Sequence, residues 1–448
     1  MTFSELNLNK SLLNALNDLG YTQPTSIQEK VFSVMMSGRD VVGIAQTGTG
    51  KTIAYLLPCL RLWKYTGDGS PQILIIVPTR ELVVQVVKEV NKLTTYLNIK
   101  VEGVYGGVNI NPQIDRVYAG CDVLVATPGR LLDLAYKGVL RLKGVKRLII
   151  DEVDEMLTLG FRHQLTSILD LLPPRRQNLM FSATMLEDIE KLIKDFFNNP
   201  QKIEAAPTGT PLDQIIQIGY HVPNFYTKVN FLTQLLSTDK EMSKVLVFVS
   251  TKKLADDLYE QLEGKLIGQL GVIHSNKAQN HRFNTVKQFH EGSYRVLIST
   301  DIMARGLDIS EITHVVNFDT PEVAEDYMHR IGRTGRADKK GIAITFLLEK
   351  DAENQANIEG LMNYKIPIES LPENLKISNE LTEDEMPKIV MKNVLVKPPK
   401  LEASNPAFHE KKEKNKKVYN KIRHKDKMKL KYGKPKTRGQ KPEGRKGK

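Results

Sequence analysis

The segment Ala45-Gln-Thr-Gly-Thr-Gly-Lys-Thr52 has the residue types and spacing of a phosphate-binding loop. It lies between the apolar run Asp40-Val-Val-Gly-Ile44 and the helix-like run Ile53-Ala-Tyr-Leu-Leu-Pro58. A buried strand that ends in a glycine-rich turn and opens a helix points backbone N–H groups and partial positive charge at one spot. Lys51 would reach the β- and γ-phosphates, and the Thr52 hydroxyl would hold Mg²⁺. This pattern predicts the binding and hydrolysis of a nucleoside triphosphate.

Ala45 occupies the position where a strict phosphate-loop pattern has glycine. The alternative interpretation is therefore a chance Gly-Lys-Thr turn. The flanking strand and helix patterns favour the phosphate loop.

Two carboxylates follow a second apolar run about one hundred residues later, in Leu148-Ile-Ile-Asp151-Glu152-Val-Asp154. A carboxylate at the C-terminal end of a strand beside a phosphate loop is where a Mg²⁺ ligand belongs. Asp151 would hold the metal through water, because Mg²⁺ dehydrates reluctantly. Glu152 would orient and deprotonate the attacking water. The alternative is an acidic turn that leads into an amphipathic helix.

An arginine cluster far along the chain, His329-Arg-Ile-Gly-Arg333-Thr-Gly-Arg336, could supply the positive charge that hydrolysis requires. An arginine at the departing γ-phosphate accelerates such reactions by ~10³–10⁵. Arg333 and Arg336 are three residues apart and would share one face of a helix. Taken alone, the cluster fits a surface turn that binds phosphate backbone equally well.

These residues need a scaffold, and short Val/Ile/Leu runs separated by helical patterns indicate α/β architecture with parallel sheets covered on both faces. Runs in the first part of the chain are Asp40–Ala45, Gln72–Pro78, Lys100–Gly106, Asp122–Thr127, Arg147–Asp151 and Asn178–Ser182. Runs in the second part are Lys244–Ser250, Gly271–His274, Tyr294–Thr300, Thr313–Phe318 and Gly341–Leu347. A small-residue and Pro/Gly stretch between them, Ala205–Leu212, is typical of a linker.

The predicted organisation is a first domain over residues 1–205, a linker over 206–215 and a second domain over 216–350. Residues 351–410 form a mixed segment with no assigned role, and residues 411–448 form a basic tail.

The tail has 18 Lys and Arg against 3 acids, a net +15, whereas the whole chain is +12. It is almost devoid of apolar residues, so we expect it to be disordered when free and to bind a polyanion. RNA is favoured over membrane because no amphipathic apolar face accompanies the charge. The alternative is a solubilising tail without a partner.

The two cysteines, Cys59 and Cys121, are far apart and suit small buried side chains in a reducing cytosol. No stretch approaches the ~18 uncharged apolar residues of a membrane span. The N-terminus lacks a basic region followed by an apolar core. We therefore expect a cytoplasmic protein with no membrane partner.

Taken together, these motifs resemble those of the DEAD-box family of ATP-dependent RNA helicases, in the family's order and spacing from about residue 3 to residue 338. The resemblance implies two tandem RecA-like domains. The segment from Phe3 to Gln28 is similar to the family's adenine-reading motif, which implies ATP, with Gln28 on the adenine edge and Phe3 stacked on the ring. The implied ATP-binding set is Phe3, Gln28, Ala45, Gln46, Thr47, Gly48, Thr49, Gly50, Lys51, Thr52 and Asp308.

The resemblance also implies that Ser182 and Thr184 pair with Asp154, that His329 couples the two domains, and that Arg333 and Arg336 are arginine fingers. It implies sequence-independent contacts with the RNA backbone, since short hydroxyls, glycines and helix starts bind phosphates and do not read base edges. The implied RNA-binding residues are Pro78, Thr79, Arg80, Gly106, Gly107, Thr127, Pro128, Gly129, Arg130, Ser250, Thr251, Gln279, Arg282 and Thr300.

Two positions depart from the family's pattern. Val153 replaces alanine in Asp-Glu-Ala-Asp, which predicts slight crowding beside the metal site with activity retained. His274-Ser-Asn276 replaces His-Gly-Asp and lacks a carboxylate in the second domain.

The predicted function is local, ATP-driven unwinding of short RNA duplexes with Mg²⁺ as cofactor. Compact bacterial members of the family serve in RNA decay, ribosome assembly and cold adaptation, so we expect partners among RNA-decay or ribosome-assembly proteins. One alternative is an RNA-binding or annealing protein with residual ATPase activity. A phosphate-loop enzyme of another kind, such as a DNA translocase or a small-molecule kinase, is the second.

Overall fold

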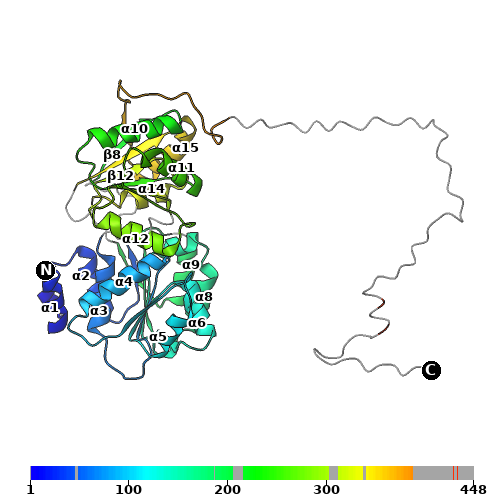
Figure 1. Ribbon diagram of the computed structural model, residues 1–448. Coiled ribbons are helices and arrows are strands. Elements are labelled where there is room, and N and C mark those ends of the chain that lie inside the picture. Colours follow the sequence, from blue (N-terminus) through cyan, green and yellow to red (C-terminus); the bar gives the residue numbers. More distant parts are fainter. Residues whose placement is uncertain are drawn as a thin grey trace, which may run out of the picture. The chain divides into compact units, whose positions relative to one another are not determined.

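A computed structural model of the chain describes residues 2–45, 49–185, 187–204, 215–301, 311–335 and 340–386, together with Lys427 and Lys431. Residues 1–386 form one compact unit. Two seven-stranded sheets lie within this unit. Figure 1 shows helices on both sides of each sheet. The predicted basic tail lies outside the described residues, apart from the two lysines named above.

The strands of the first sheet are β1 (Val41–Ile44), β2 (Ile73–Ile76), β3 (Val101–Val104), β4 (Val123–Ala126), β5 (Arg147–Ile150), β6 (Gln177–Ser182) and β7 (Gln201–Glu204). Their order across the sheet is β3-β4-β2-β5-β6-β1-β7, with every neighbouring pair parallel. All the predicted strands of this half are present.

The helices of the first half are η1 (Phe3–Leu6), α1 (Lys10–Asp18), α2 (Ser26–Met36), α3 (Lys51–Arg61), α4 (Arg80–Leu93), α5 (Asn111–Tyr118), α6 (Pro128–Tyr136), η2 (Leu142–Gly144), α7 (Val153–Thr158), α8 (Arg162–Leu171) and α9 (Glu187–Phe196). Successive strand residues point to opposite faces of a sheet. Accordingly, Ile73 and Ile75 pack in one core with α1 to α4, while Leu74 and Ile76 pack in a second core with α5 to α9. Burial on both faces explains why these strands read as continuous apolar runs.

The strands of the second sheet are β8 (Ile215–His221), β9 (Val245–Phe248), β10 (Leu270–Ile273), β11 (Val296–Ser299), β12 (His314–Asn317), β13 (Gly341–Leu347) and β14 (Ile368–Glu369). Their order is β10-β11-β9-β12-β13-β8-β14, again parallel throughout. The accompanying helices are α10 (Phe225–Thr238), α11 (Lys252–Glu263), α12 (Gln279–His290), α14 (Ala324–Ile331), η3 (Glu349–Asp351) and α15 (Ala352–Met362).

The second half extends beyond residue 350, where the sequence prediction ended it. Ile358 and Met362 of α15 pack against Tyr327 of α14, and β14 adds a strand beside β8. Leu375, further along, joins the core that contains α10 and α11. Part of the segment without an assigned role, through residue 386, is therefore part of this half.

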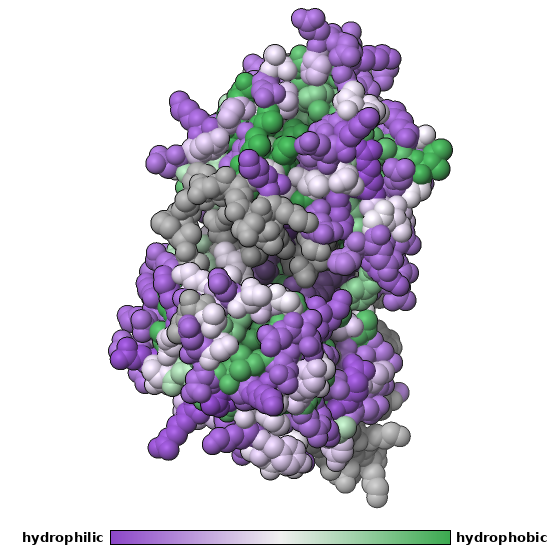
Figure 2. Space-filling model, turned by 90° about the vertical axis from the view of Figure 1, so that its left-hand side faces the viewer, coloured by the Kyte–Doolittle hydropathy of each residue, from purple (hydrophilic) through white to green (hydrophobic). Residues whose placement is uncertain are grey.

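The face of the molecule in Figure 2 is largely hydrophilic. Figure 2 shows charged and polar residues over most of one face, with smaller hydrophobic patches between them. Across the described parts of the chain, no helix combines the length and the apolar character that a membrane crossing requires.

Candidate functional site

The strand order divides the C-terminal edge of the first sheet into two neighbouring regions. The segments that follow β1, β5 and β6 lie together because these strands are adjacent. They contain the phosphate loop, the Asp151–Asp154 carboxylates and Ser182–Thr184. The segments after β2, β3 and β4 lie together on the other side and contain all the predicted RNA-binding residues of this half.

Lys51 is the first residue of α3 and is only 7% exposed. Its Nζ atom has no hydrogen-bond partner among the described residues. Burying a charged amine without a partner is costly, so the site favours an anionic ligand. A phosphate at the N-terminus of α3 would meet this requirement.

Gly50 precedes Lys51 in a left-handed conformation, with φ of +88°. An added Cβ there would lie 2.5 Å from Nε2 of Gln28, so this position requires glycine. Gln28 Nε2 donates to the Gly50 carbonyl at 3.2 Å, and Thr25 Oγ1 donates to the Thr49 carbonyl at 3.1 Å. The start of α2 is thereby joined to the phosphate loop.

Gln28 and Phe3, the two residues implied for adenine, are both buried. The Oε1 atom of Gln28 accepts from the Thr25 N–H at 2.9 Å and so caps α2. Phe3 begins η1 and packs in the core on the α1 to α4 face. Their roles in adenine binding remain predictions.

Asp151 and Glu152 follow β5, with Glu152 in a left-handed conformation (φ 52°, ψ 50°) at the start of α7. This conformation is uncommon for a residue with a side chain, and such strain concentrates at functional sites. Burial raises the pKa of the Asp151 carboxyl, and the nearby Lys51 charge opposes this rise. Burial raises the pKa of the Glu152 carboxyl as well; the Asp151 charge adds to this rise, whereas the Lys51 and Arg333 charges oppose it.

Asp154 joins α7 to the end of β6. Its Oδ2 atom accepts hydrogen bonds from the backbone N–H of Ala183 at 2.8 Å and of Thr184 at 3.1 Å. The Thr184 hydroxyl donates to the same oxygen at 3.3 Å, while the Ser182 hydroxyl donates to the Thr184 carbonyl at 2.6 Å. Thr184 therefore pairs with Asp154 as expected, whereas Ser182 contacts Thr184 instead; the part of these residues in coupling remains a prediction.

The second half contributes to the same place. One pocket is lined by residues of both halves, namely Lys51, Glu152, Asp154, Glu155, Ala183, His329 and Arg333. Arg333 lies close enough to lower the pKa of Glu152. The structure thus brings together five of the predicted catalytic and coupling residues. Gln46, Thr47, Gly48, Asp308 and Arg336 lie outside the described residues.

Several predicted RNA-binding residues occupy the starts of helices. Thr79 caps α4 through Leu82, and Thr251 caps α11 through Leu254. Thr127 precedes α6, whose first residue is Pro128. Helix starts can offer backbone N–H groups to phosphates.

Three other predicted RNA-binding residues contact one another across the two halves. Arg80 Nη1 donates to Gln279 Oε1 at 2.9 Å, and Gln279 Nε2 donates to Glu81 Oε1 at 3.0 Å. Arg282 forms an ion pair with Glu81, and both residues are buried. In this arrangement these residues connect α4 with α12.

Two further polar residues of the second half were missed in the sequence. Asp319 accepts hydrogen bonds from Ser250, and Arg330 pairs with Asp301 through distances of 2.5 and 2.7 Å. Asp319 comes directly after a predicted strand, as Asp151 does, and this placement was an available signal. Arg330 lies inside the arginine cluster, but roles were predicted only for His329, Arg333 and Arg336.

The two departures from the family's pattern have local explanations. Val153 is fully buried in the core formed with α5 to α9, so its methyl groups pack in that core. Asn276 accepts a hydrogen bond from Lys252 at 3.1 Å, and therefore retains a polar contact without a carboxylate. The cysteines are free and buried, as expected, and burial raises the pKa of each thiol to about 12.

Two parallel-sheet domains of the RecA-like kind, in which Lys51 of the first and Arg333 of the second line one pocket, define a protein of the tandem RecA-like class. Comparison with known families agrees with this class. Residues 25–192 match the DEAD/DEAH box helicase family, and residues 227–338 match the helicase conserved C-terminal domain.

Individual relatives give the same result. The chain is 40% identical over 358 residues to the DEAD-box ATP-dependent RNA helicase CshA of Bacillus cereus, covering 80% of this chain and 67% of the relative. CshA of Geobacillus kaustophilus is 38% identical, covering 80% and 76%. S. cerevisiae Dbp5, solved bound to RNA and ADP BeF3, superposes with a TM-score of 0.74 at 31% identity, covering 83% of this chain and 95% of that one. This chain belongs to the DEAD/DEAH box helicase family.

Proposed function

We propose that this protein is an ATP-dependent RNA helicase that opens short RNA duplexes by ATP-driven closure of its two RecA-like domains. The observation that carries this proposal is the shared pocket, in which Lys51 and Glu152 of the first half meet His329 and Arg333 of the second. A reaction centre built from both halves is complete only when they are together. The cycle of ATP binding and release can then open and close an RNA-binding surface.

The residues present fit ATP and Mg²⁺. The buried amine of Lys51, without a partner among the described residues, suits the β- and γ-phosphates. Thr52 and Asp151 provide the oxygen ligands that Mg²⁺ prefers. Bound Mg²⁺ would neutralise charge that develops on the phosphates during hydrolysis.

The chain's own residues would perform the remaining chemistry. Glu152 would accept a proton from the attacking water; burial raises the pKa of its carboxyl, which makes it a better base, and the Lys51 and Arg333 charges oppose that rise. Arg333 and Arg336 would stabilise charge on the departing phosphate. Asp154, with Ser182 and Thr184, would transmit the result of hydrolysis within the first half.

RNA would be bound through its backbone, independently of sequence. The helix starts after β2 and β4 in the first sheet and after β9 in the second are suited to phosphate contacts. The basic segment over residues 411–448 would add electrostatic attraction and raise the local concentration of RNA.

The cellular setting is proposed from the family and the chemistry of the chain. RNA decay, ribosome assembly or cold adaptation would supply structured RNA substrates and protein partners. Two buried free thiols suit a reducing compartment, and we propose the cytoplasm.

A duplex-unwinding assay with the full chain tests the proposal. Lys51→Ala and Glu152→Gln should abolish both RNA-stimulated ATP hydrolysis and unwinding, whereas Lys191→Ala, an exposed surface control, should retain both. Undiminished RNA remodelling by the first two variants would instead favour an annealing protein. Stronger stimulation of ATP hydrolysis by DNA than by RNA would favour a DNA translocase.

A further inference from the structure

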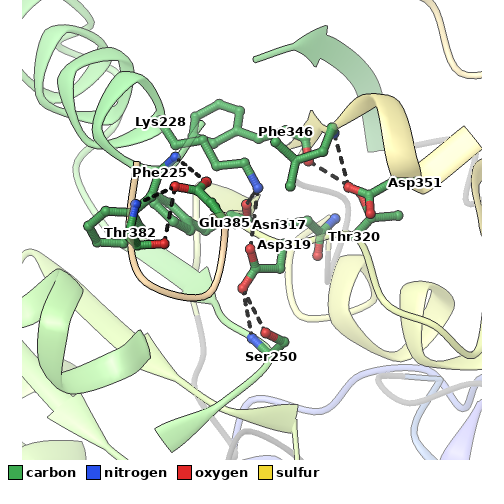
Figure 3. A network of polar contacts seen from close by, with 12 residues as sticks. Phe225, Lys228, Ser250, Asn317, Asp319, Thr320, Phe346, Asp351, Thr382 and Glu385 are labelled. Atoms are coloured by element: carbon green, nitrogen blue, oxygen red, sulfur yellow. Dashed lines mark hydrogen bonds and ion pairs between the residues drawn. The ribbon is translucent and has the colours of Figure 1, made fainter. Parts of the chain in front are cut away.

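We propose that Lys228 is a positioning residue, which sets the RNA-binding loop at Ser250 through the carboxylate of Asp319; this inference rests on the proposed function. We call the Lys228–Asp319 pair, together with Ser250 and Arg330, which Asp319 also contacts, the Asp319 junction. Figure 3 shows the Asp319 carboxylate between the Lys228 ammonium group and Ser250.

The first part of the junction is a buried cation. Lys228, in the first turn of α10, is 2% exposed. Its Nζ atom donates to the Phe318 carbonyl at 2.7 Å, lies 3.3 Å from Asp319 Oδ1, and sits 5.4 Å from the centre of the Phe318 ring. A buried charge with three such contacts is tightly held, and removing it would leave Asp319 without its counter-charge.

The second part is the link from Asp319 to the RNA side. The other carboxylate oxygen, Oδ2, accepts both the backbone N–H of Ser250 at 2.9 Å and its hydroxyl at 3.0 Å. These two bonds hold the residue that directly precedes Thr251, the cap of α11. Lys228 holds one oxygen of the Asp319 carboxylate. This contact fixes the orientation in which the other oxygen faces Ser250.

The third part leads toward the nucleotide side. The Asp319 backbone carbonyl accepts from Arg330 Nη1 at 2.6 Å. Arg330 is 2% exposed, pairs with Asp301, and lies on α14 next to His329, which lines the shared pocket. A single residue after β12 therefore contacts both the loop proposed to bind RNA and the helix proposed to meet ATP.

A positioning role of Lys228 can be distinguished from a general contribution to the stability of α10. The N-terminus of α10 has a second carboxylate contact, since the Phe225 N–H donates to Glu385 Oε1 at 2.7 Å. Glu385 is held in turn by Thr382, and its hydrogen bonds to Phe225 and Thr382 do not involve Ser250 or Arg330. Glu385→Ala is therefore a matched control, which loosens the same helix without touching the junction.

The test compares the full-length protein and its variants in RNA-stimulated ATP hydrolysis. Lys228→Met should raise the KM for RNA roughly tenfold with a smaller change in kcat, because the loop that binds RNA is mispositioned. Lys228→Arg, which keeps the charge, should restore most of the RNA affinity. Glu385→Ala should lower the melting temperature and leave the KM for RNA unchanged.

A double-mutant cycle gives the sharper readout. The effects of Lys228→Met and Ser250→Ala on RNA affinity should be less than multiplicative, because both act on one contact, whereas Lys228→Met and Arg130→Ala should multiply. Multiplicative effects in the first pair, or an unchanged KM for RNA in Lys228→Met, would overturn the inference. Asp319→Asn serves the same cycle should Lys228→Met fail to fold. The wild-type protein, assayed alongside, tests the proposed function separately. That function is wrong if RNA does not stimulate ATP hydrolysis by the wild type.

Discussion

Glu81 of α4 and Arg282 of α12 form a buried ion pair between the two halves of the chain. Gln279 bonds to Glu81 and to Arg80, so the pair belongs to a small polar cluster. The resemblance assigned Arg80, Gln279 and Arg282 to the RNA backbone. Their mutual contacts indicate that they also hold the halves together.

Breaking this pair should impair closure. Glu81→Ala or Arg282→Ala leaves one buried charge without its partner, and we expect RNA-stimulated kcat/KM to fall roughly tenfold or more. The exchange of Glu81→Arg with Arg282→Glu in one protein should recover part of the loss, since opposite charges again face each other. The role would be contradicted if the combined variant were no more active than the product of the activities of Glu81→Arg and Arg282→Glu, each measured alone.

Val153 should matter for stability more than for catalysis. Because the side chain is fully buried in an apolar core, Val153→Ala should lower the free energy of unfolding by about 1–3 kcal/mol. Chemical denaturation measures this loss, with the exposed Val84→Ala as control. ATP hydrolysis below the unfolding transition should be unchanged, and a large gain in kcat would instead support crowding of the metal site.

Features with a local sequence pattern could be predicted, whereas contacts between distant residues could not. Strands buried on both faces have continuous apolar runs, and the phosphate loop and carboxylates follow two of them, so these features were predicted. Strand β7, Gln-Lys-Ile-Glu, is at the sheet edge with one buried residue and has no such signal. The Glu81–Arg282 pair joins residues about two hundred positions apart, and no local pattern indicates such a contact.

The same limit applies to the Asp319 junction. Lys228 looks like an ordinary helix lysine in the sequence, and only the folding of α10 beside the end of β12 buries it. Residues 351–386 were also left without a role, because their strand has two residues and their contacts are with distant α10 and α14.

His314 should make stability depend on pH. Burial lowers the pKa of this histidine, although Asp239, 3.6 Å from its Nε2 atom, and Glu241 oppose the shift, while Arg295 adds to it. The unfolded chain takes up a proton near pH 6.5 and the folded chain at lower pH, so stability present above about pH 6.5 is lost as the pH falls.

Melting temperatures between pH 7.5 and 5.5 measure this effect. The contribution of His314 cannot exceed about 1.4 kcal/mol per pH unit. His314→Asn should flatten the profile, whereas the exposed His163→Asn should leave it unchanged. A profile as steep in His314→Asn as in the wild type would contradict the assignment.

The basic tail should act through electrostatics. Removal of residues 411–448 takes away a net +15, so RNA affinity should fall most at low salt. The slope of log affinity against log salt concentration should become shallower, while ATP hydrolysis without RNA stays the same. Identical slopes for the full and shortened chains would show that the tail does not contact RNA.

The central claim is that the two halves share one reaction centre, and Arg333→Ala in the full-length protein tests it most directly. Measured at saturating RNA and ATP, kcat for ATP hydrolysis should fall on the order of 10³-fold, because the charge on the departing phosphate loses its partner from the second half. ATP affinity should change little, and Arg162→Ala, at an exposed ion pair of the first half, should behave as wild type. A folded Arg333→Ala protein with near-normal kcat would contradict the shared centre.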